Sequence, residues 1–223
     1  MIKLYHIDAE TDPNGGSRNA AKISIALREL GLTFETINLD RMTDLRPLDA
    51  PFRQINPNGV TPAIDDDGLV LWESSAVLRY LADSYAENSV LALGDLQQTA
   101  LTQQWLSWEA ATVFRGVLSV FFAMLAEPLN QQALDAAITE YNGLLAVLDA
   151  QLDGQDYVAG PYSIADIALG CVIGVGLNMQ ISLLPYRNIM QWLVRLAERP
   201  AWQQELAFVN DLKAGREAGL IAE

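Results

Sequence analysis

Residues 73–75 combine side chains and backbone groups that can hold an anion. Glu73, Ser74 and Ser75 follow the apolar stretch Leu69-Val70-Leu71-Trp72 and precede apolar residues at helical spacing. Ser74 is therefore expected where a strand ends and a helix begins, and the first N–H groups of a helix have no partner inside it. The serine hydroxyl, these N–H groups and the helix dipole together can bind a carboxylate. Simple capping of the helix by Ser74 or Ser75 is the alternative.

A second candidate is the turn-rich segment Asn56-Pro57-Asn58-Gly59-Val60-Thr61-Pro62. The cis form of an X-Pro peptide bond lies only about 0.5–1 kcal/mol above the trans form, so a proline is the usual means of making a sharp reversal. An ordinary turn proline is the alternative for Thr61-Pro62. Either way, the segment predicts a tight loop before a strand that begins at Ala63.

The elements that position these segments begin with a β–α–β order. Residues 2–6 and 33–39 alternate as strands do, and apolar residues at helical spacing lie between them from Ile23 to Leu30. This order implies parallel pairing of the two strands with a right-handed crossover. The loop at 8–16 is rich in Asp, Pro, Asn and Gly, so it is predicted to be irregular.

Two short strands and a run of helices complete the chain. Asp65-Asp66-Asp67-Gly68 is a hairpin signal between strands at 63–64 and 69–72. From about residue 95 onward the periodic segments are all helical, at 97–126, 131–152, 163–178, 187–198 and 200–212. A mixed unit followed by helices indicates two domains, which we place at residues 1–86 and 95–223.

Four motifs in this order resemble the cytosolic glutathione transferases, in particular bacterial members of the serine or nu-like type. They are residues 56–63, residues 72–77, Tyr162-Ser163-Ile164-Ala165-Asp166-Ile167-Ala168, and the segment from Tyr186-Arg187-Asn188-Ile189 through Arg199-Pro200-Ala201-Trp202. The resemblance implies a thioredoxin-like domain followed by an all-helical domain. It also implies glutathione as co-substrate and a homodimer.

The resemblance assigns roles to the two candidate segments. In that family the proline corresponding to Pro62 is cis, and the backbone of the residue before it, here Thr61, pairs with the cysteinyl part of glutathione. Ser74 and the helix N-terminus would receive the γ-glutamyl carboxylate, and Glu73 would lie near the ligand's amino group. Local donors of this kind would let an acidic protein bind an anionic tripeptide.

The group that activates the thiol varies within this family. A free thiol with a pKa near 8.5 is mostly protonated at neutral pH, so a hydrogen-bond donor must stabilise the thiolate. By resemblance Ser17 is the first candidate and Asn19 the second. Capping of the first helix is the alternative role for Ser17. Asp12-Pro13-Asn14-Gly15 mimics a loop motif of the nu-like branch, and we interpret it as an insertion.

Val60 departs from the family pattern. Many relatives carry a lysine here that pairs with the glycyl carboxylate of glutathione, and the chain has no cation at this position. A hydrogen bond to a charged group contributes about 1.5–3 kcal/mol, so its loss would weaken binding by one to two decades. Arg18, Lys22 or Arg53 are the candidates to replace it.

In the helical domain, Trp108 and Phe114 are the candidates for the wall of an apolar electrophile pocket, with a purely structural core role as the alternative. Ser163-x-x-Asp166 predicts a capping box. Cys171 lies in an apolar helix and is expected to be buried and inert. The sequence has no spacing typical of a metal site, so no metal is expected.

Composition restricts the partners and the compartment. The formal charge of −14 would repel nucleic acid and anionic membranes, so neither is an expected partner. The single cysteine, the absence of a signal-peptide pattern and the lack of an uninterrupted apolar stretch of membrane-spanning length favour the cytoplasm.

Three functions fit these observations. The first is conjugation of glutathione to a small hydrophobic electrophile. The second is glutathione-dependent reduction of a disulfide or peroxide, which Asn19 as the main donor would favour. The third is a non-catalytic interaction module of the same fold, which Val60 would favour because it weakens the ligand site.

Overall fold

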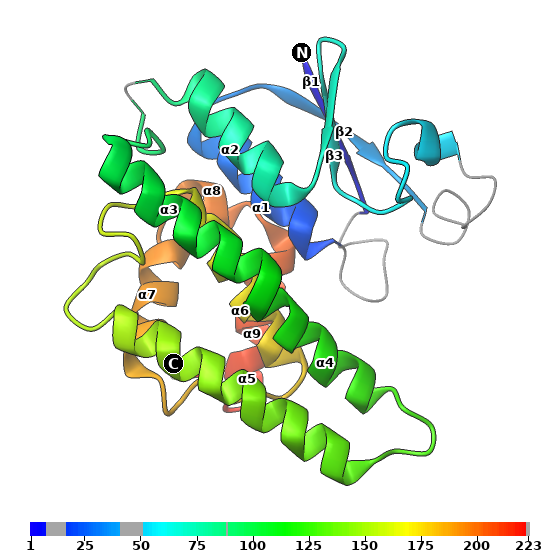
Figure 1. The fold of residues 1–223 in the computed structure, drawn as a ribbon, viewed down its shortest axis with the longest axis vertical. Helices are drawn as coiled ribbons and strands as arrows, with labels where there is room; N and C mark the ends of the chain where they lie inside the picture. Colours follow the sequence, from blue (N-terminus) through cyan, green and yellow to red (C-terminus); the bar gives the residue numbers. More distant parts are fainter. Residues whose placement is uncertain (8–16, 41–50, 88, 222–223) are drawn as a thin grey trace.

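A computed structural model describes residues 1–7, 17–40, 51–87 and 89–221 (Figure 1). Its N-terminal part contains a four-stranded sheet in the order β2-β1-β3-β4. The strands are β1 (Ile2–His6), β2 (Phe34–Asn38), β3 (Ala63–Asp66) and β4 (Leu69–Trp72). β1 pairs in parallel with β2 and antiparallel with β3, and β3 and β4 form the hairpin. The predicted β–α–β unit and hairpin are both confirmed.

Two helices pack side by side next to this sheet, with their N-terminal ends on the same side (Figure 1). α1 (Arg18–Glu29) follows β1, and α2 (Ser74–Tyr85) follows β4 directly. A short 3-10 helix, η1 (Pro51–Gln54), precedes the loop at 56–62. Residues 20–27 of α1 are all buried, because α1 contacts the sheet, α2 and the helical part at once. A helix that is buried on all sides lies in the middle of a structure.

The remainder of the described chain is helical. The helices are α3 (Leu96–Trp108), the π-helical turn η2 (Glu109–Val113), α4 (Phe114–Met124), α5 (Gln131–Gln151), α6 (Ile164–Asn178), α7 (Arg187–Ala197), α8 (Pro200–Gln203) and α9 (Leu206–Glu217). The single helix predicted at 200–212 is wrong. α8 ends after one turn, and Glu205, with φ −94° and ψ 97°, is the extended N-cap of α9.

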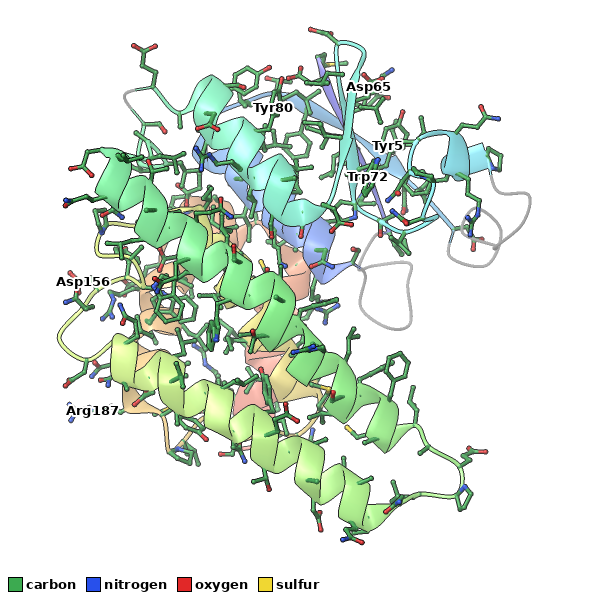
Figure 2. All side chains as sticks on the ribbon, in the orientation of Figure 1. Tyr5, Asp65, Trp72, Tyr80, Asp156 and Arg187 are labelled. Atoms are coloured by element: carbon green, nitrogen blue, oxygen red, sulfur yellow. The ribbon has the colours of Figure 1, made fainter. Side chains whose placement is uncertain are left out.

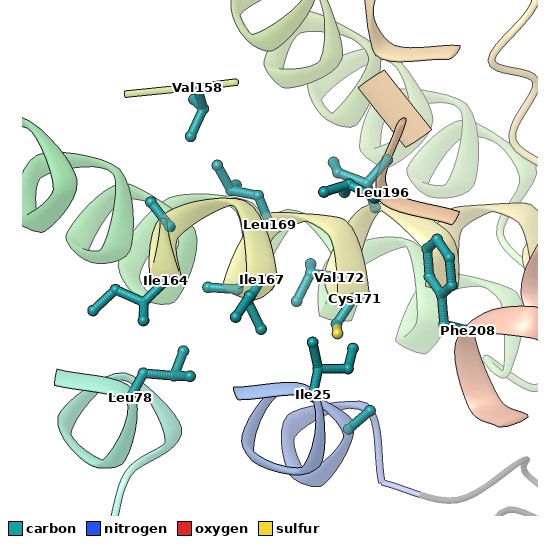
Figure 3. Packing of buried hydrophobic residues seen from close by; sticks show 14 of the residues in the cluster. Ile25, Leu78, Val158, Ile164, Ile167, Leu169, Cys171, Val172, Leu196 and Phe208 are labelled. Carbon is teal, nitrogen blue, oxygen red and sulfur yellow. The ribbon is translucent and has the colours of Figure 1, made fainter. Parts of the chain in front are cut away.

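α6 forms the centre of the core. Figure 3 shows Ile25 of α1, Leu78 of α2 and Phe208 of α9 arranged around it. A side chain at Gly170 would place its Cβ 2.5 Å from the ring of Trp202, so only glycine permits this approach. The cluster of buried apolar residues runs through both parts of the chain. The domain boundaries at residues 86 and 95 therefore stay a prediction.

Four ion pairs join α1 to the helical part. They are Arg18–Asp211 at 2.5 Å, Lys22–Glu109 at 2.9 Å, Arg28–Glu205 at 3.1 Å and Glu29–Arg199 at 2.7 Å. The Lys22–Glu109 pair stands apart because both side chains are only 1% exposed. Charges that are removed from water in this way must be paired, so α1 carries much of the specific contact between the two parts.

The stretch Leu96–Met124 has the length and composition of a membrane-crossing helix, with a mean hydropathy of 1.2 in its most apolar window. In the structure it packs against α5 and α6. Its Glu109 is buried against Lys22 of the N-terminal part. A helix in the core of a folded domain can have the same composition.

The capping box predicted at Ser163 and Asp166 is confirmed at the start of α6. Asp166 accepts hydrogen bonds from the backbone N–H groups of Ser163 and Val158, both at 2.9 Å, and from Nε1 of Trp192 at 3.0 Å. Its side chain thus connects α6, α7 and the segment before α6. Burial raises the pKa of Asp166 to about 6, against the opposing effect of these hydrogen bonds.

We expect the Asp166 carboxyl to titrate near pH 6 in the folded protein, rather than at its ordinary value of 3.8. Its folded-state pKa is raised, so its contribution to stability is fully present below pH 3.8 and is lost as the pH rises through about 6. Carbon-13 NMR of the side-chain carboxyls, with Asp166→Asn to assign the signal, measures the midpoint. A midpoint at or below pH 4 would contradict the expectation.

Candidate functional site at the end of the sheet

Strand register brings the predicted site segments to one end of the sheet. Ala63 pairs with Trp72 across the β3–β4 hairpin, so the residues before Ala63 and after Trp72 lie at the same end. Ala63 also pairs with Tyr5 of β1. Two residues further along, the carbonyl oxygen of Ile7 accepts a hydrogen bond from the backbone N–H of Ser17 at 3.1 Å. Thr61-Pro62, Glu73-Ser74 and Ser17 therefore meet at this end.

The loop at 56–62 is organised by a buried residue, Asn56, which is 2% exposed. Its Nδ2 donates to the carbonyl oxygen of Val60 at 2.6 Å, and its Oδ1 accepts from the backbone N–H of Asn58 at 3.0 Å. The Thr61–Pro62 peptide bond is cis, as the resemblance implied. From the sequence alone, Asn56 is predicted only to be a turn residue. The signal is an asparagine at the start of a turn-rich segment, because its side chain can accept a hydrogen bond from the backbone two residues on, as in an Asx-turn.

Arg53 lies against the same loop. Its Nη1 donates to the carbonyl oxygen of Pro57 at 2.9 Å. Gly59 has a φ of +66°, which favours glycine, and a Cβ there would lie 3.3 Å from the Arg53 guanidinium, which would have to shift slightly. Nε of Arg53 is buried and has no hydrogen-bond partner within the described part of the chain. The guanidinium thus lies against Gly59, the residue before the exposed Val60.

The other two candidate cations are already paired. Arg18 donates from Nε to Asp211 at 3.1 Å and from Nη2 to the same carboxylate at 2.5 Å. Lys22 is buried in its pair with Glu109. Of the three residues considered as replacements for the missing lysine, Arg53 is the one that contacts the loop.

The start of α2 has an unusual backbone at its N-cap. Glu73 has φ 69° and ψ 107°, a region that L side chains rarely adopt, and its side chain makes no capping hydrogen bond. Strain of this kind tends to persist where a ligand site requires it. Ser74 is half-buried at the first position of the helix. The carboxylate of Glu73 is exposed and does not make the hydrogen bond that an N-cap side chain usually makes.

Ser17 is the N-cap of α1, and its Oγ accepts a hydrogen bond from the backbone N–H of Ala20 at 3.3 Å. The capping role considered from the sequence is thus present. It leaves the hydroxyl proton available, because Oγ acts only as the acceptor in this bond. Capping and donation to a bound thiolate are compatible.

Asn19, the second residue of α1, accepts a hydrogen bond from a buried lysine. Its Oδ1 accepts a hydrogen bond from Nζ of Lys22 at 2.7 Å, and Nζ also donates to Glu109 at 2.9 Å. Because Oδ1 is engaged by a cation, the amide NH2 of Asn19 is the group that can donate to a ligand. Nζ also lies 5.9 Å from the centre of the Phe114 ring. Glu109 and Phe114 come from the π turn and the first residue after it, a type of irregularity that is frequent at functional sites.

Comparison with known proteins identifies the family. Residues 16–84 match the model of the glutathione S-transferase N-terminal domain, and residues 114–200 match that of the C-terminal domain. The chain belongs to the glutathione S-transferase family. It is therefore a glutathione transferase, with the fold that the four sequence motifs predicted.

Individual relatives cover most of this transferase. It is 34% identical to glutathione S-transferase GstB of Escherichia coli strain K12 over 83% of this chain and 91% of that protein. It is 30% identical to glutathione S-transferase D7 of Drosophila melanogaster over 96% of this chain and 98% of that protein. The theta class glutathione S-transferase of Xanthomonas axonopodis pv. citri, solved with glutathione bound, superposes with a TM-score of 0.77 at 30% identity, covering 92% and 96% of the two chains.

The two predicted pocket residues differ in their surroundings. Phe114 lies near Lys22 and hence near Asn19 of this transferase. Trp108, half-buried, packs edge to face on Trp105 with ring centres 5.1 Å apart. The contacts of Phe114 thus connect it, through Lys22, with a site candidate, whereas the ring contact of Trp108 is with another residue of α3.

Three further sequence interpretations can be located. Cys171 is buried, and burial raises the pKa of its thiol well above the ordinary value, so the thiol is unreactive in the folded chain. Asp12-Pro13-Asn14-Gly15 lies outside the described residues. Among the residues that are described, no group of three or more His, Cys, Asp and Glu side chains could hold a metal ion.

Proposed function

We propose that this chain conjugates the thiolate of glutathione to a small hydrophobic electrophile, and that it acts in the cytoplasm as a homodimer. The observation that carries the proposal is the meeting of Ser17, Thr61 and Ser74 at one end of the sheet, which follows from the pairing of Ala63 with both Trp72 and Tyr5. This arrangement supports a site in which a donor for the thiolate, a backbone edge and a helix N-terminus contact one ligand.

The γ-glutamyl end of glutathione binds at the start of α2 in this proposal. The Ser74 hydroxyl and the first N–H groups of the helix receive its carboxylate, and the helix dipole assists. Glu73 pairs with the ligand's amino group, since its side chain makes no capping bond and is exposed. Thr61 presents its backbone to the cysteinyl part, in the loop that Asn56 holds in place.

The glycyl carboxylate pairs with Arg53. This side chain lies against Gly59, next to Val60, where many relatives have a lysine. Its buried Nε has no hydrogen-bond partner among the described residues, and a ligand carboxylate would supply one. Arg53 of η1 thus replaces the cation that is missing at position 60. The alternative of a non-catalytic module rested on that missing cation and loses its main support.

The thiolate is stabilised by Ser17, with Asn19 as the second donor. Phe114 and the residues around it supply the apolar surface for the electrophile. A specific observation also favours the second candidate function, glutathione-dependent disulfide or peroxide reduction. Lys22 holds Asn19 with its amide group free to donate, and Asn19 is the donor expected for that chemistry.

Replacing Ser74 with alanine is expected to weaken glutathione binding about tenfold or more, because a hydrogen bond to a charged carboxylate contributes about 1.5–3 kcal/mol. Isothermal titration calorimetry with glutathione measures the change. Ser75→Ala is the matched control, since Ser75 is the next residue of α2 and is also half-buried. Equal affinities for the two variants would remove Ser74 from the site.

The function itself is tested by two activity assays on the wild-type protein. Conjugation of glutathione to a chloronitrobenzene is followed by absorbance, and reduction of hydroxyethyl disulfide is followed in parallel. Dominant conjugation supports the first candidate, and dominant reduction supports the second. Failure of the wild-type protein to bind glutathione would overturn both.

A further inference from the structure

A short chain of hydrogen bonds ends at Asn19, two residues after Ser17. Nζ of Lys22 donates to Oδ1 of Asn19 at 2.7 Å and to Oε1 of Glu109 at 2.9 Å. The side chains of Lys22 and Glu109 are each 1% exposed, whereas Asn19 is half-buried. Lys22 is therefore covered by protein, and Asn19 is the member of this chain that a bound ligand can touch.

Stability alone does not account for the Lys22–Glu109 pair. The loss of hydration largely offsets the attraction between two buried charges, so apolar residues of similar volume often serve a fold equally well. Oε2 of Glu109 is also buried without a hydrogen-bond partner among the residues that the structure describes. The more exposed pair Arg28–Glu205 already joins α1 to the helical part. What sets Lys22 apart is its bond to Asn19, a candidate thiol donor.

The bond from Lys22 decides which end of the Asn19 amide is free. An amide has an acceptor oxygen and a donor NH2 group of similar size, and a half-turn of the side chain exchanges them. The oxygen would repel a thiolate, whereas the NH2 group would donate to it. An ammonium has only donors, so it can bond only to the oxygen. Its charge also polarises the amide, which strengthens the NH2 group as a donor.

We propose that Lys22, fixed in place by Glu109, is a positioning residue for the reaction: it holds Asn19 with its NH2 group directed toward the sulfur of bound glutathione. Asn19 then donates to the thiolate beside Ser17. When the thiol ionises, its proton passes to solvent, and the electron pair left on sulfur accepts these hydrogen bonds. The inference rests on the proposed function, because it requires glutathione to bind at this end of the sheet.

The pH at which the bound thiol ionises tests the proposal, measured by thiolate absorbance of the glutathione complex. The variant is Lys22→Met/Glu109→Gln, which leaves no buried charge, and urea denaturation checks that it is folded. We expect its ionisation pH to lie about one unit above that of the wild-type complex, and kcat/KM for conjugation to fall about tenfold. A purely structural role would leave the ionisation pH unchanged.

A mutant cycle tests whether Lys22 acts through Asn19. In the wild-type background, Asn19→Ala should lower kcat/KM by about tenfold. In the Lys22→Met/Glu109→Gln background, it should lower kcat/KM by less than about threefold, because residues that share one interaction are not additive. Equal losses in the two backgrounds would show that Lys22 does not act through Asn19 and would overturn the proposal.

Asn19→Asp separates the bond to Lys22 from donation to the ligand. It keeps an oxygen for Lys22 and loses the NH2 group, so the ionisation pH should again rise by about one unit or more. Arg187→Gln is the control for charge, because it changes the net charge by the same amount. Arg187 is exposed and lies on the opposite side of the molecule from Tyr5 and Trp72 at the sheet (Figure 2). A wild-type ionisation pH in Asn19→Asp would overturn the proposal, even where the double variant does not fold.

The control for the lost ion pair is Arg28→Met/Glu205→Gln. It removes another pair between α1 and the helical part, joined at 3.1 Å, and should leave the ionisation pH unchanged. A shift as large as that of Lys22→Met/Glu109→Gln would overturn the proposal. If the wild-type protein binds glutathione and the Lys22 variant ionises it at the same pH, the inference fails and the proposed function stands. If the wild-type protein does not bind glutathione, the proposed function fails.

Discussion

Replacing Glu109 with glutamine is expected to lower the free energy of unfolding by about 3–5 kcal/mol. Glu109 and Lys22 are each 1% exposed and are joined at 2.9 Å, so removing one charge leaves the other buried without its counter-ion. Denaturation by urea at neutral pH, with linear extrapolation to water, measures the change. The loss is large against the marginal stability of a folded domain.

The control for this prediction is an exposed pair of the same charges. Arg79 and Asp83 on α2 form an i,i+4 pair at 2.7 Å, with side chains 36% and 51% exposed. Asp83→Asn should change the free energy of unfolding by only about 0.3–0.5 kcal/mol. The double variant Lys22→Met/Glu109→Gln should recover a large part of the single-variant loss, since no buried charge remains. If Glu109→Gln lowers the free energy of unfolding as little as Asp83→Asn does, the Lys22–Glu109 pair is not shielded from water.

Replacing Ser17 with alanine is expected to lower kcat/KM for conjugation by about 10²–10³-fold. This is the usual effect of removing one donor that stabilises a developing or resident anion at an active site. The dissociation constant for glutathione should change little, because the donor acts on the thiolate and not on the carboxylates. The pH at which the bound thiol ionises should rise toward that of the free thiol, and the thiolate absorbance of the bound ligand follows it directly.

Two controls separate donation from capping. Asn130 caps α5 by accepting from the backbone N–H of Ala133 at 3.1 Å, and Asn130→Ala should lose a similar amount of stability, about 1 kcal/mol, without loss of activity. Ser17→Thr keeps both the cap and the donor and should restore most of the activity. If Ser17→Ala behaves as Asn130→Ala does, Ser17 serves only as a cap. Asn19→Ala then becomes the variant that decides the donor.

The sequence-based predictions that the structure confirms depend on contacts between residues that are close together in the sequence. The hairpin at residues 65–68 requires a turn with left-handed backbone, and Asp67 and Gly68 have φ values of 48° and 98°. The Ser163–Asp166 box joins residues three apart. The predicted helix at 200–212 failed because its break at Glu205 depends on how α8 and α9 pack, and the apolar period alone does not reveal it.

By itself, the sequence determined the order of the strands and helices, the family, and the segments proposed to carry the ligand site. These properties depend on turn residues, caps and apolar spacing, which act over a few positions. Tertiary structure alone decided which charges are paired. Lys22 and Glu109 are 87 residues apart, and Arg18 and Asp211 are 193 apart. A buried charge selects its partner by distance in space, so only the folded chain shows that Arg53 lies against the loop at Pro57 and Gly59.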